Sequence, residues 1–137
     1  MTNTYDQSLT DILNAQMPLS QHLGLKGVEA STESVAIGGN WKAEHCGIGG
    51  VLHGGYLMAL ADAAGATLAF LNLPDGATTT TVESKTNFFR PVTGGSVKAT
   101  STLVHSGRAT IVAQTDVTDD SGALVSRTLQ TQIVRAG

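Results

Sequence analysis

The sequence predicts an α+β fold, a single domain in which a curved antiparallel β-sheet wraps around a long central α-helix. An apolar stretch over residues 51–73 is long enough for a helix of about six turns. Four segments rich in Thr, Val and Ile follow it, separated by short turns that contain Gly, Pro or Asp. The length of 137 residues and the hydrophobic content of 41% fit one compact domain spanning residues 1–137.

The first part of the chain is predicted to form a small helical cap over residues 1–23. Apolar residues recur at helical spacing over residues 6–16, and a Met-Pro pair then interrupts the pattern. Residues 19–24 have the pattern of a second short turn that ends on a glycine. Residues 25–41 shift to a period of two, and a turn at residues 31–33 would divide them into two strands.

The apolar stretch predicts a central helix over residues 53–72, preceded by a glycine-rich loop over residues 43–52. Ala or Gly at seven positions between 59 and 69 lets other backbones come close. The helix is apolar around most of its circumference, so we expect a curved sheet or another subunit to cover it. The later predicted strands are 78–90, 95–105, 109–118 and 123–135. Together these elements predict the hotdog architecture.

Composition and charge exclude several classes of partner. The basic residues are scattered and the net charge is −3, so a footprint for nucleic acid is missing. Asp62 near the middle of the apolar stretch would cost roughly 2.5–3.5 kcal/mol in a bilayer, which argues against a membrane span. The single cysteine, Cys46, forms no internal disulfide, and the first 16 residues lack the regions of a signal peptide. We therefore expect a cytoplasmic protein.

Asp62 is the most informative residue, because its neighbours at helical spacing are apolar. An unpaired carboxylate buried there would cost several kcal/mol. Three interpretations are open: a residue that faces a solvent channel, a functional carboxylate in a cleft, or a structural pair with His53 or Lys85.

His53, Gly54 and Gly55 lie at the predicted helix start, where unsatisfied backbone N–H groups and the positive end of the helix dipole point outward. Glycine lets a substrate approach the backbone closely. A backbone N–H at this place can stabilise the negative oxygen that forms when a carbonyl is attacked. Glycines at a helix start also serve simply as turn formers.

Two other arrangements are disfavoured. His45, Cys46 and His53 match no common zinc spacing, and no further ligand pair completes a four-coordinate site, so we expect no metal and no cofactor. Cys46 as a nucleophile would need a histidine base, but side chains adjacent in a loop seldom face each other.

The string from Leu52 to Asp62, LHGGYLMALAD, resembles the HGG(x)6D/E signature of hotdog-fold acyl-CoA thioesterases of the phenylacetate-pathway (PaaI) type. Residues 81–91, TVESKTNFFRP, look like the strand after the central helix in those enzymes, and Gly107-Arg108 suits their next hairpin. The resemblance covers roughly residues 18–134. It implies hydrolysis of an acyl-CoA to the free acid and CoA.

The resemblance also implies a role for each matching residue. Asp62 would be the nucleophile or the general base for water, and the N–H of Gly54 would polarise the thioester carbonyl. His53 would help fix the loop, while Thr81 of the neighbouring subunit, or Thr80 instead, would orient the water. We also expect substrate contacts from Gly55, Gly47, Met58, Phe88, Arg90 and Arg108. The two arginines either contact the CoA phosphates or are simply solvated. Met58, Phe88 and Phe89 favour a medium-chain or aromatic acyl group.

The chain departs from the family pattern at one position. Many members carry Asn or Gln six residues before the histidine, where this chain has Gly47. Either His45, Cys46 or a neighbouring side chain compensates, or activity is low, or the protein is a non-catalytic acyl-CoA binding or regulatory protein.

The resemblance further implies a homo-oligomer, a dimer or a dimer of dimers (homotetramer), with active sites shared between subunits.

Overall fold

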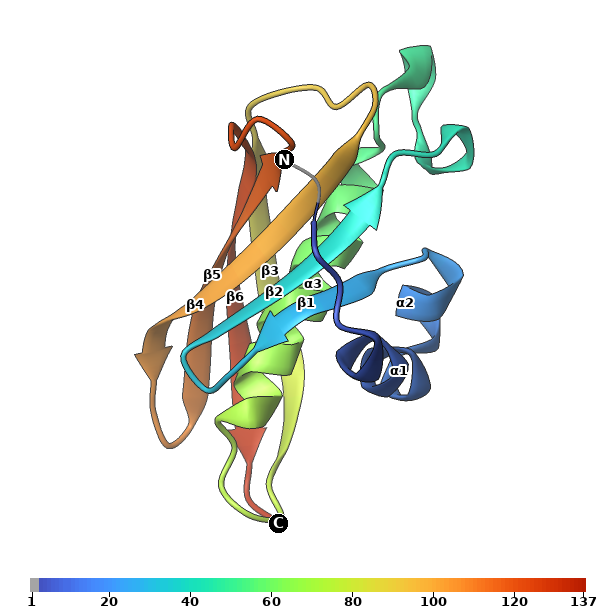
Figure 1. Cartoon of the computed structure of the whole chain (residues 1–137). Coiled ribbons are helices and arrows are strands. Elements are labelled where there is room, and N and C mark those ends of the chain that lie inside the picture. Colours follow the sequence, from blue (N-terminus) through green and yellow to red (C-terminus); the bar gives the residue numbers. More distant parts are fainter. Residues whose placement is uncertain (1–2) are drawn as a thin grey trace.

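The computed structural model describes residues 3–137, so residues 1 and 2 of the predicted cap lie outside the described part. It confirms the α+β fold: one six-stranded antiparallel sheet packs against a long helix (Figure 1). The helices are α1 (Gln7–Gln16), α2 (Pro18–His22) and α3 (Gly54–Leu71), and the strands are β1 (Lys26–Ala30), β2 (Ser34–Asn40), β3 (Thr78–Phe88), β4 (Ser96–Ser106), β5 (Thr110–Asp119) and β6 (Leu124–Arg135). Each predicted element is present with its ends within two residues.

The loop over residues 43–52 has more structure than its composition predicts. It contains two short 3-10 helices, Ala43–His45 and Ile48–Gly50. The backbone of Gly49 and Gly50 has positive φ, 81° and 74°, which L side chains rarely adopt. These two glycines therefore allow the tight turn that leads into α3.

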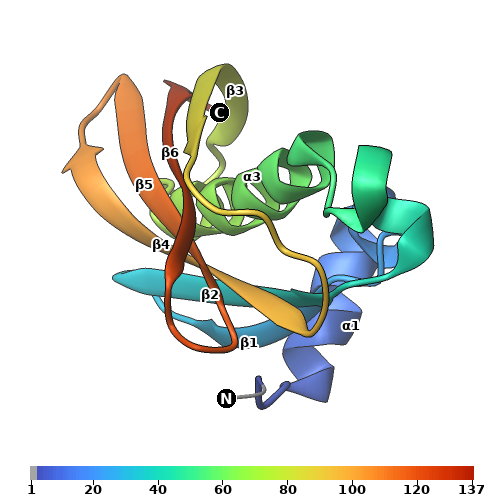
Figure 2. The same ribbon diagram turned by 90° about the horizontal axis from the view of Figure 1, so that it is seen from above.

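The sheet has the strand order β1-β2-β4-β5-β6-β3 and curves around α3 (Figure 2). The buried side of α3, which includes Leu57, Leu60, Ala64 and Leu68, packs into the hydrophobic core on the concave face. α3 is also long and apolar enough to cross a membrane, with a mean hydropathy of 1.3, but half of it is buried inside the fold. Burial against a sheet is the property of a core helix.

The other side of α3 is left partly open. Residues at a spacing of four, from Gly54 through Met58, Asp62 and Ala66 to Phe70, are only partly buried or exposed. This is the part of the helix that one sheet does not cover, as its all-round apolar character predicts. The last strand in the sheet order, β3, pairs with β6 on one side and has no strand on the other among residues 3–137.

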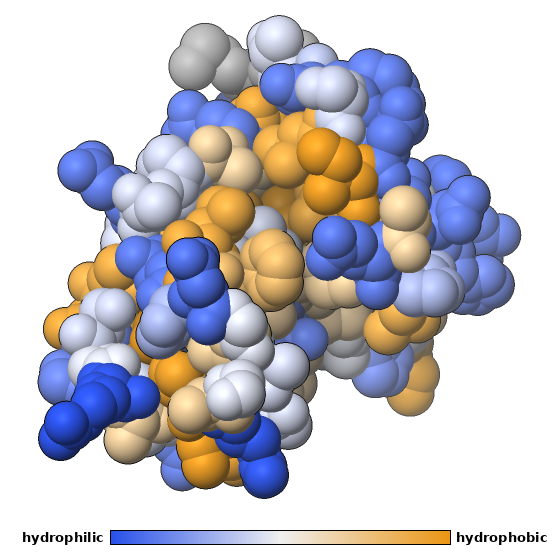
Figure 3. All heavy atoms as spheres, turned by 90° about the horizontal axis from the view of Figure 1, so that it is seen from below, coloured by the Kyte–Doolittle hydropathy of each residue, from blue (hydrophilic) through white to orange (hydrophobic). Residues whose placement is uncertain are grey.

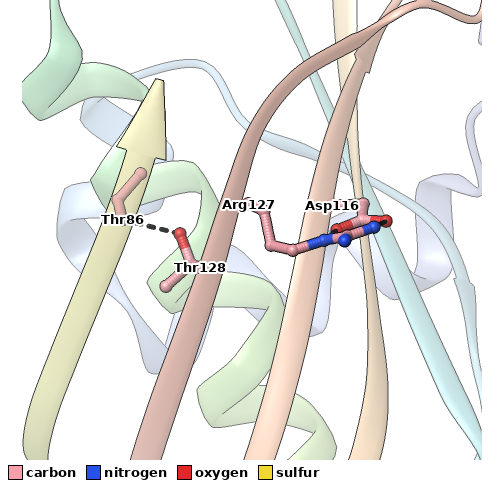
Figure 4. A network of polar contacts seen from close by, with 4 residues as sticks. All are labelled: Thr86, Asp116, Arg127 and Thr128. Carbon is pink, nitrogen blue, oxygen red and sulfur yellow. Dashed lines mark hydrogen bonds and ion pairs between the residues drawn. The ribbon is translucent and has the colours of Figure 1, made fainter. Parts of the chain in front are cut away.

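Alternate side chains of β6 face opposite sides of the sheet, which decides what can reach α3 (Figure 4). Thr128 is buried and shares a 2.7 Å hydrogen bond with Thr86 of β3. Arg127, its neighbour, is exposed and forms two hydrogen bonds of 2.7 and 2.8 Å with Asp116 of β5. The even-numbered residues of β6 after Thr128 therefore face the helix.

Candidate active site

His53 caps the N-terminus of α3 with its side chain. Nδ1 accepts the N–H of Gly55 at 2.8 Å, so the proton of the neutral imidazole lies on Nε2. The ring is exposed, which leaves Nε2–H available to a ligand. The N–H of Gly54 has no acceptor among residues 3–137, as the first position of a helix predicts. Two donors thus lie at the positive end of the helix dipole.

The glycines at this helix start permit close contacts. A Cβ on Gly54 would lie 3.1 Å from the ring of Phe88, and a Cβ on Gly55 would lie 2.9 Å from Nδ1 of His53. An open cavity of about 460 Å³ adjoins them. It is lined by Val51, Leu52, Gly54, Leu57, Phe88, Phe89, Arg90 and Pro91. The structure therefore brings the predicted substrate contacts Phe88 and Arg90 beside the free N–H of Gly54.

Asp62 lies two turns further along α3 and faces β3 and β6. Its Oδ1 accepts the side-chain amide of Gln130 at 2.7 Å and the hydroxyl of Thr81 at 3.3 Å. Its Oδ2 accepts no hydrogen bond from any described residue. One carboxylate oxygen is thus held in place, and the other is available.

The polar network around Asp62 extends along β6 and β3. The amide of Gln130 also donates to Oε1 of Gln132 at 2.9 Å, and Thr81 hydrogen-bonds to the same oxygen. The amide of Gln132 donates to the hydroxyl of Thr79 at 3.1 Å. Gln130 and Gln132 are 0% and 2% exposed, so the network lies inside the molecule. Buried polar groups of this kind are stable only when they bond to one another.

The structure excludes one of the three interpretations of Asp62, the structural pair with His53 or Lys85. Neither predicted structural partner bonds to it, because His53 accepts from Gly55 and Lys85 donates to Asn87. Thr81 contacts Asp62 within one chain, whereas the resemblance implied a threonine from the neighbouring subunit. Thr80, the alternative to Thr81, is exposed and lies between two inward-facing threonines, so it is on the wrong face of β3.

Of two other predicted contacts, Arg108 lies apart from Asp62 and Met58 lies close to it. Arg108 lies in the turn between β4 and β5, where Ala109 accepts a hydrogen bond from Val134 near the end of β6. This end of the sheet is opposite to the one that holds Arg90, so the two arginines do not lie at one site within a single chain. Met58 lies one turn before Asp62 on the partly open side of α3.

Gly47 lies next to His53, where a Cβ would be 3.5 Å from Cδ2 of the ring. Its φ of −89° and ψ of −152° are accessible to other residues. No side chain of the described loop over residues 43–52 hydrogen-bonds to Asp62. The amide that does so comes from β6 instead.

For the thioester hydrolysis that the resemblance implies, replacement of Gly47 by Asn is expected to leave kcat unchanged or to raise it. The substitution adds an amide beside His53 without backbone strain, since φ is negative and the space is open. Thioester hydrolysis and the melting temperature would be measured for both proteins. A lower melting temperature with no gain in kcat would show instead that position 47 requires glycine.

His45 and Cys46 contact their surroundings within the chain and have a structural role. The ring of His45 stacks on Tyr56 with centroids 4.8 Å apart, and Sγ of Cys46 donates to the carbonyl of Lys42 at 3.3 Å. Burial raises the pKa of Tyr56 to about 12, so the stacked phenol stays neutral. These side chains support the start of α3 from behind.

A second cavity begins one helical turn beyond Asp62. Its volume is about 300 Å³, and it lies between α1 and the second half of α3. The lining residues are Leu9, Ile12, Leu13, Gln16, Met17, Ala30, Ala66, Thr67, Phe70, Leu71 and Thr79. Figure 3, a view from below, shows a large group of hydrophobic side chains in the upper centre of this face, with smaller hydrophobic groups among hydrophilic side chains elsewhere. Because Ala66 and Thr79 belong to its wall, the cavity adjoins the network around Asp62.

Sequence reasoning missed Gln130, Gln132 and Thr79. A signal was present, because Ser126, Thr128, Gln130 and Gln132 place a polar residue at every second position of β6. A stripe with this period is ordinarily the solvent face of a strand. Here it faces α3, where Asp62 supplies the charge that makes polar partners favourable.

Comparison with known proteins shows the family of the chain. Residues 49–126, more than half of the chain, match the model of a family described as the thioesterase superfamily. One relative is a Haemophilus influenzae protein that is named as a candidate esterase. It is 37% identical to the present chain over 75 residues. This match spans 55% of the present chain and 54% of that relative, about half of its length.

Solved structures extend the similarity to nearly the whole chain. The thioesterase HI1161 of Haemophilus influenzae superposes with a TM-score of 0.87 at 26% identity, covering 98% of this chain and 94% of that one. A mutant of the phenylacetic acid degradation protein PaaI from Thermus thermophilus gives a TM-score of 0.79 at 29% identity, covering 85% of this chain and 97% of that one. The chain therefore belongs to the thioesterase superfamily and has the hotdog fold of these enzymes.

Proposed function

We propose that the protein hydrolyses acyl-CoA thioesters to the free acid and CoA. The observation that carries the proposal is Asp62, a carboxylate in an apolar helix with Oδ1 held by Gln130 and Oδ2 available. It lies between an apolar cavity and a helix N-terminus with free donors. These are the parts that thioester hydrolysis needs: a base or nucleophile, an oxyanion donor and a place for the acyl group.

In this mechanism Asp62 acts on the thioester carbonyl in one of two ways. As a general base it takes a proton from water, whose oxygen attacks the carbonyl carbon while the C–S bond breaks. The leaving thiolate of CoA then receives the proton. As a nucleophile Asp62 attacks the carbon itself, the C–S bond breaks and the CoA thiolate leaves. Water then cleaves the acyl-Asp62 anhydride to the free acid, and the thiolate receives the proton that the water loses. In both cases the N–H of Gly54 stabilises the oxyanion, and Nε2–H of His53 is a second donor.

The cavity beyond Asp62 is a suitable binding site for an apolar acyl group. Its volume of about 300 Å³ is at the small end of ligand pockets, and its wall is almost wholly hydrophobic. A medium-chain or aromatic acyl group fits this description. The cavity beside Gly54 would then hold the CoA side, with Arg90 available to a phosphate.

Helix geometry supports a site made by two subunits. Gly54 and Asp62 are eight residues apart on α3, about 12 Å along the helix axis. One carbonyl group must lie about 3 Å from both the attacking atom and the oxyanion donor. Asp62 of one chain therefore needs the Gly54 N–H of another, and the partly open side of α3 carries both residues.

Hotdog thioesterases are typically oligomeric. We therefore expect a homodimer, or a dimer of dimers, in which two copies of α3 face each other in opposite directions. A two-fold axis then generates two equivalent sites, each with Asp62 and Thr81 from one chain and Gly54 from the other. The shared pair is thus Asp62 and Gly54, in place of the Asp62 and Thr81 pair that the resemblance implied.

A panel of acyl-CoAs tests the proposal. The protein would be incubated with straight-chain and aromatic acyl-CoAs, and the released CoA would be followed with a thiol reagent. Turnover that favours medium-chain or aromatic acyl groups supports the proposal. Tight binding without turnover, measured by calorimetry, would instead support a non-catalytic acyl-CoA binding protein.

A further inference from the structure

We propose that Gln130 is a positioning residue for Asp62, and that its amide makes Oδ2 the oxygen that meets the water or the thioester. The inference rests on the proposed function, because it assigns the working atom of the same carboxylate. Gln130 touches no substrate in this scheme. It acts through Asp62 alone.

The geometry around the amide supports this role. Nε2 of Gln130 lies 2.7 Å from Oδ1 of Asp62, 2.9 Å from Oε1 of Gln132 and 3.2 Å from Oγ1 of Thr81. An amide nitrogen has two hydrogens, so the two shortest contacts take both. The hydrogen bond to Gln132 fixes the amide plane, and the other hydrogen then points at Oδ1. Asp62 is held through this one oxygen and is free to react through the other.

Burial of the Gln130 amide destabilises the folded state, so a functional role would explain why a glutamine is at this position. Gln130 is fully buried, and its Oε1 has no hydrogen-bond partner among the described residues. A buried amide oxygen without a partner destabilises the folded state relative to an apolar side chain of the same shape. The amide of Gln130 provides a hydrogen bond to Asp62, which an apolar side chain could not form.

Gly65 of α3 leaves the space that the side-chain amide of Gln130 occupies. Glycine in the middle of a helix is destabilising relative to alanine, yet α3 has glycine at position 65. A Cβ there would overlap Oε1 of Gln130. Two residues that each disfavour the fold thus fit together, and their joint result is an amide held against Asp62.

The test replaces Gln130 by Met, which has a similar length and no donor. The expected result is a fall in kcat of about tenfold with KM unchanged, the effect of losing one hydrogen bond to a charged group. Thr128→Val is the matched control, since Thr128 lies on the same strand and face and its side chain hydrogen-bonds, among residues 3–137, only to Thr86. It also removes a buried polar group, and it is expected to leave kcat unchanged. Equal kcat in the Gln130→Met and wild-type proteins would overturn the inference.

A double-mutant cycle separates positioning from general loss of structure. Because Gln130 acts through Asp62, Gln130→Met is expected to have no further effect on the residual rate of the Asp62→Asn protein. A tenfold loss in both backgrounds would contradict the inference. If the wild-type protein hydrolyses no member of the panel, the proposed function fails, and thermal unfolding of the wild-type, Gln130→Met and Asp62→Ala proteins and of the double variant decides the inference, because alanine cannot accept the hydrogen bond. Non-additive shifts in melting temperature support the contact, and additive shifts overturn it.

Discussion

Replacement of Asp62 by Asn is expected to lower kcat for acyl-CoA hydrolysis by roughly 10²–10⁴ if Asp62 is the general base, and by more if it is the nucleophile. Asparagine keeps the shape of the side chain and can still accept the hydrogen bond from Gln130. It has no basic oxygen that can take a proton from water at neutral pH. The fold and the acyl cavity are therefore kept while the chemical step is lost. The measurement is kcat with the best acyl-CoA of the panel.

Asp75→Asn is the control for this substitution. It makes the same chemical change on an exposed aspartate in the turn after α3, and it is expected to leave kcat unchanged. Circular dichroism would show that both variants are folded. Near-full hydrolysis by a folded Asp62→Asn protein would refute the proposed mechanism.

Replacement of Gly54 by Pro is expected to lower kcat by roughly 10²–10³, the loss seen when one oxyanion donor is removed from other enzymes. Proline removes the N–H and nothing else that the helix needs, because the first position of a helix has no acceptor for it. His53, the preceding residue, has φ −62° and ψ 138°, a conformation that suits the residue before proline.

Gly54→Ala separates the N–H from the space around it. Both substitutions add a Cβ beside the ring of Phe88, which is 49% exposed and can shift, but only proline removes the donor. Alanine is therefore expected to keep most of the activity. Equal losses in the two variants would show that the ring contact matters and the N–H does not.

The sequence predicts the fold well because each helix and strand is indicated by the residue pattern of its own segment. The apolar stretch over residues 51–73 fixes α3, and turns rich in glycine, proline and aspartate separate the strands. The curvature of the sheet follows from the helix, since α3 is too apolar to be covered by a flat sheet. The two 3-10 helices before α3 were missed because glycines carry no periodic signal.

The site was predictable only where a residue is out of place in its own element. Asp62 is a charge in an apolar helix, and Gly54 is a glycine at a helix start, so both could be found. Gln130 could not, because a polar residue in a strand looks like solvent-facing surface until the register puts it against Asp62. Arg108 lies in the hairpin where the sequence placed it, but the end of a hairpin says nothing about its distance from α3.

Complementation between two inactive variants tests the central claim, that Asp62 of one chain and Gly54 of another form each site. Asp62→Asn and Gly54→Pro proteins would be mixed, dissociated and allowed to reassociate, with subunit exchange shown independently by mass spectrometry. A mixed dimer has one site with both defects and one intact site. Random pairing makes about half of the dimers mixed, so about a quarter of wild-type activity should return. No recovery despite proven exchange would contradict the shared site and place the whole reaction within one chain.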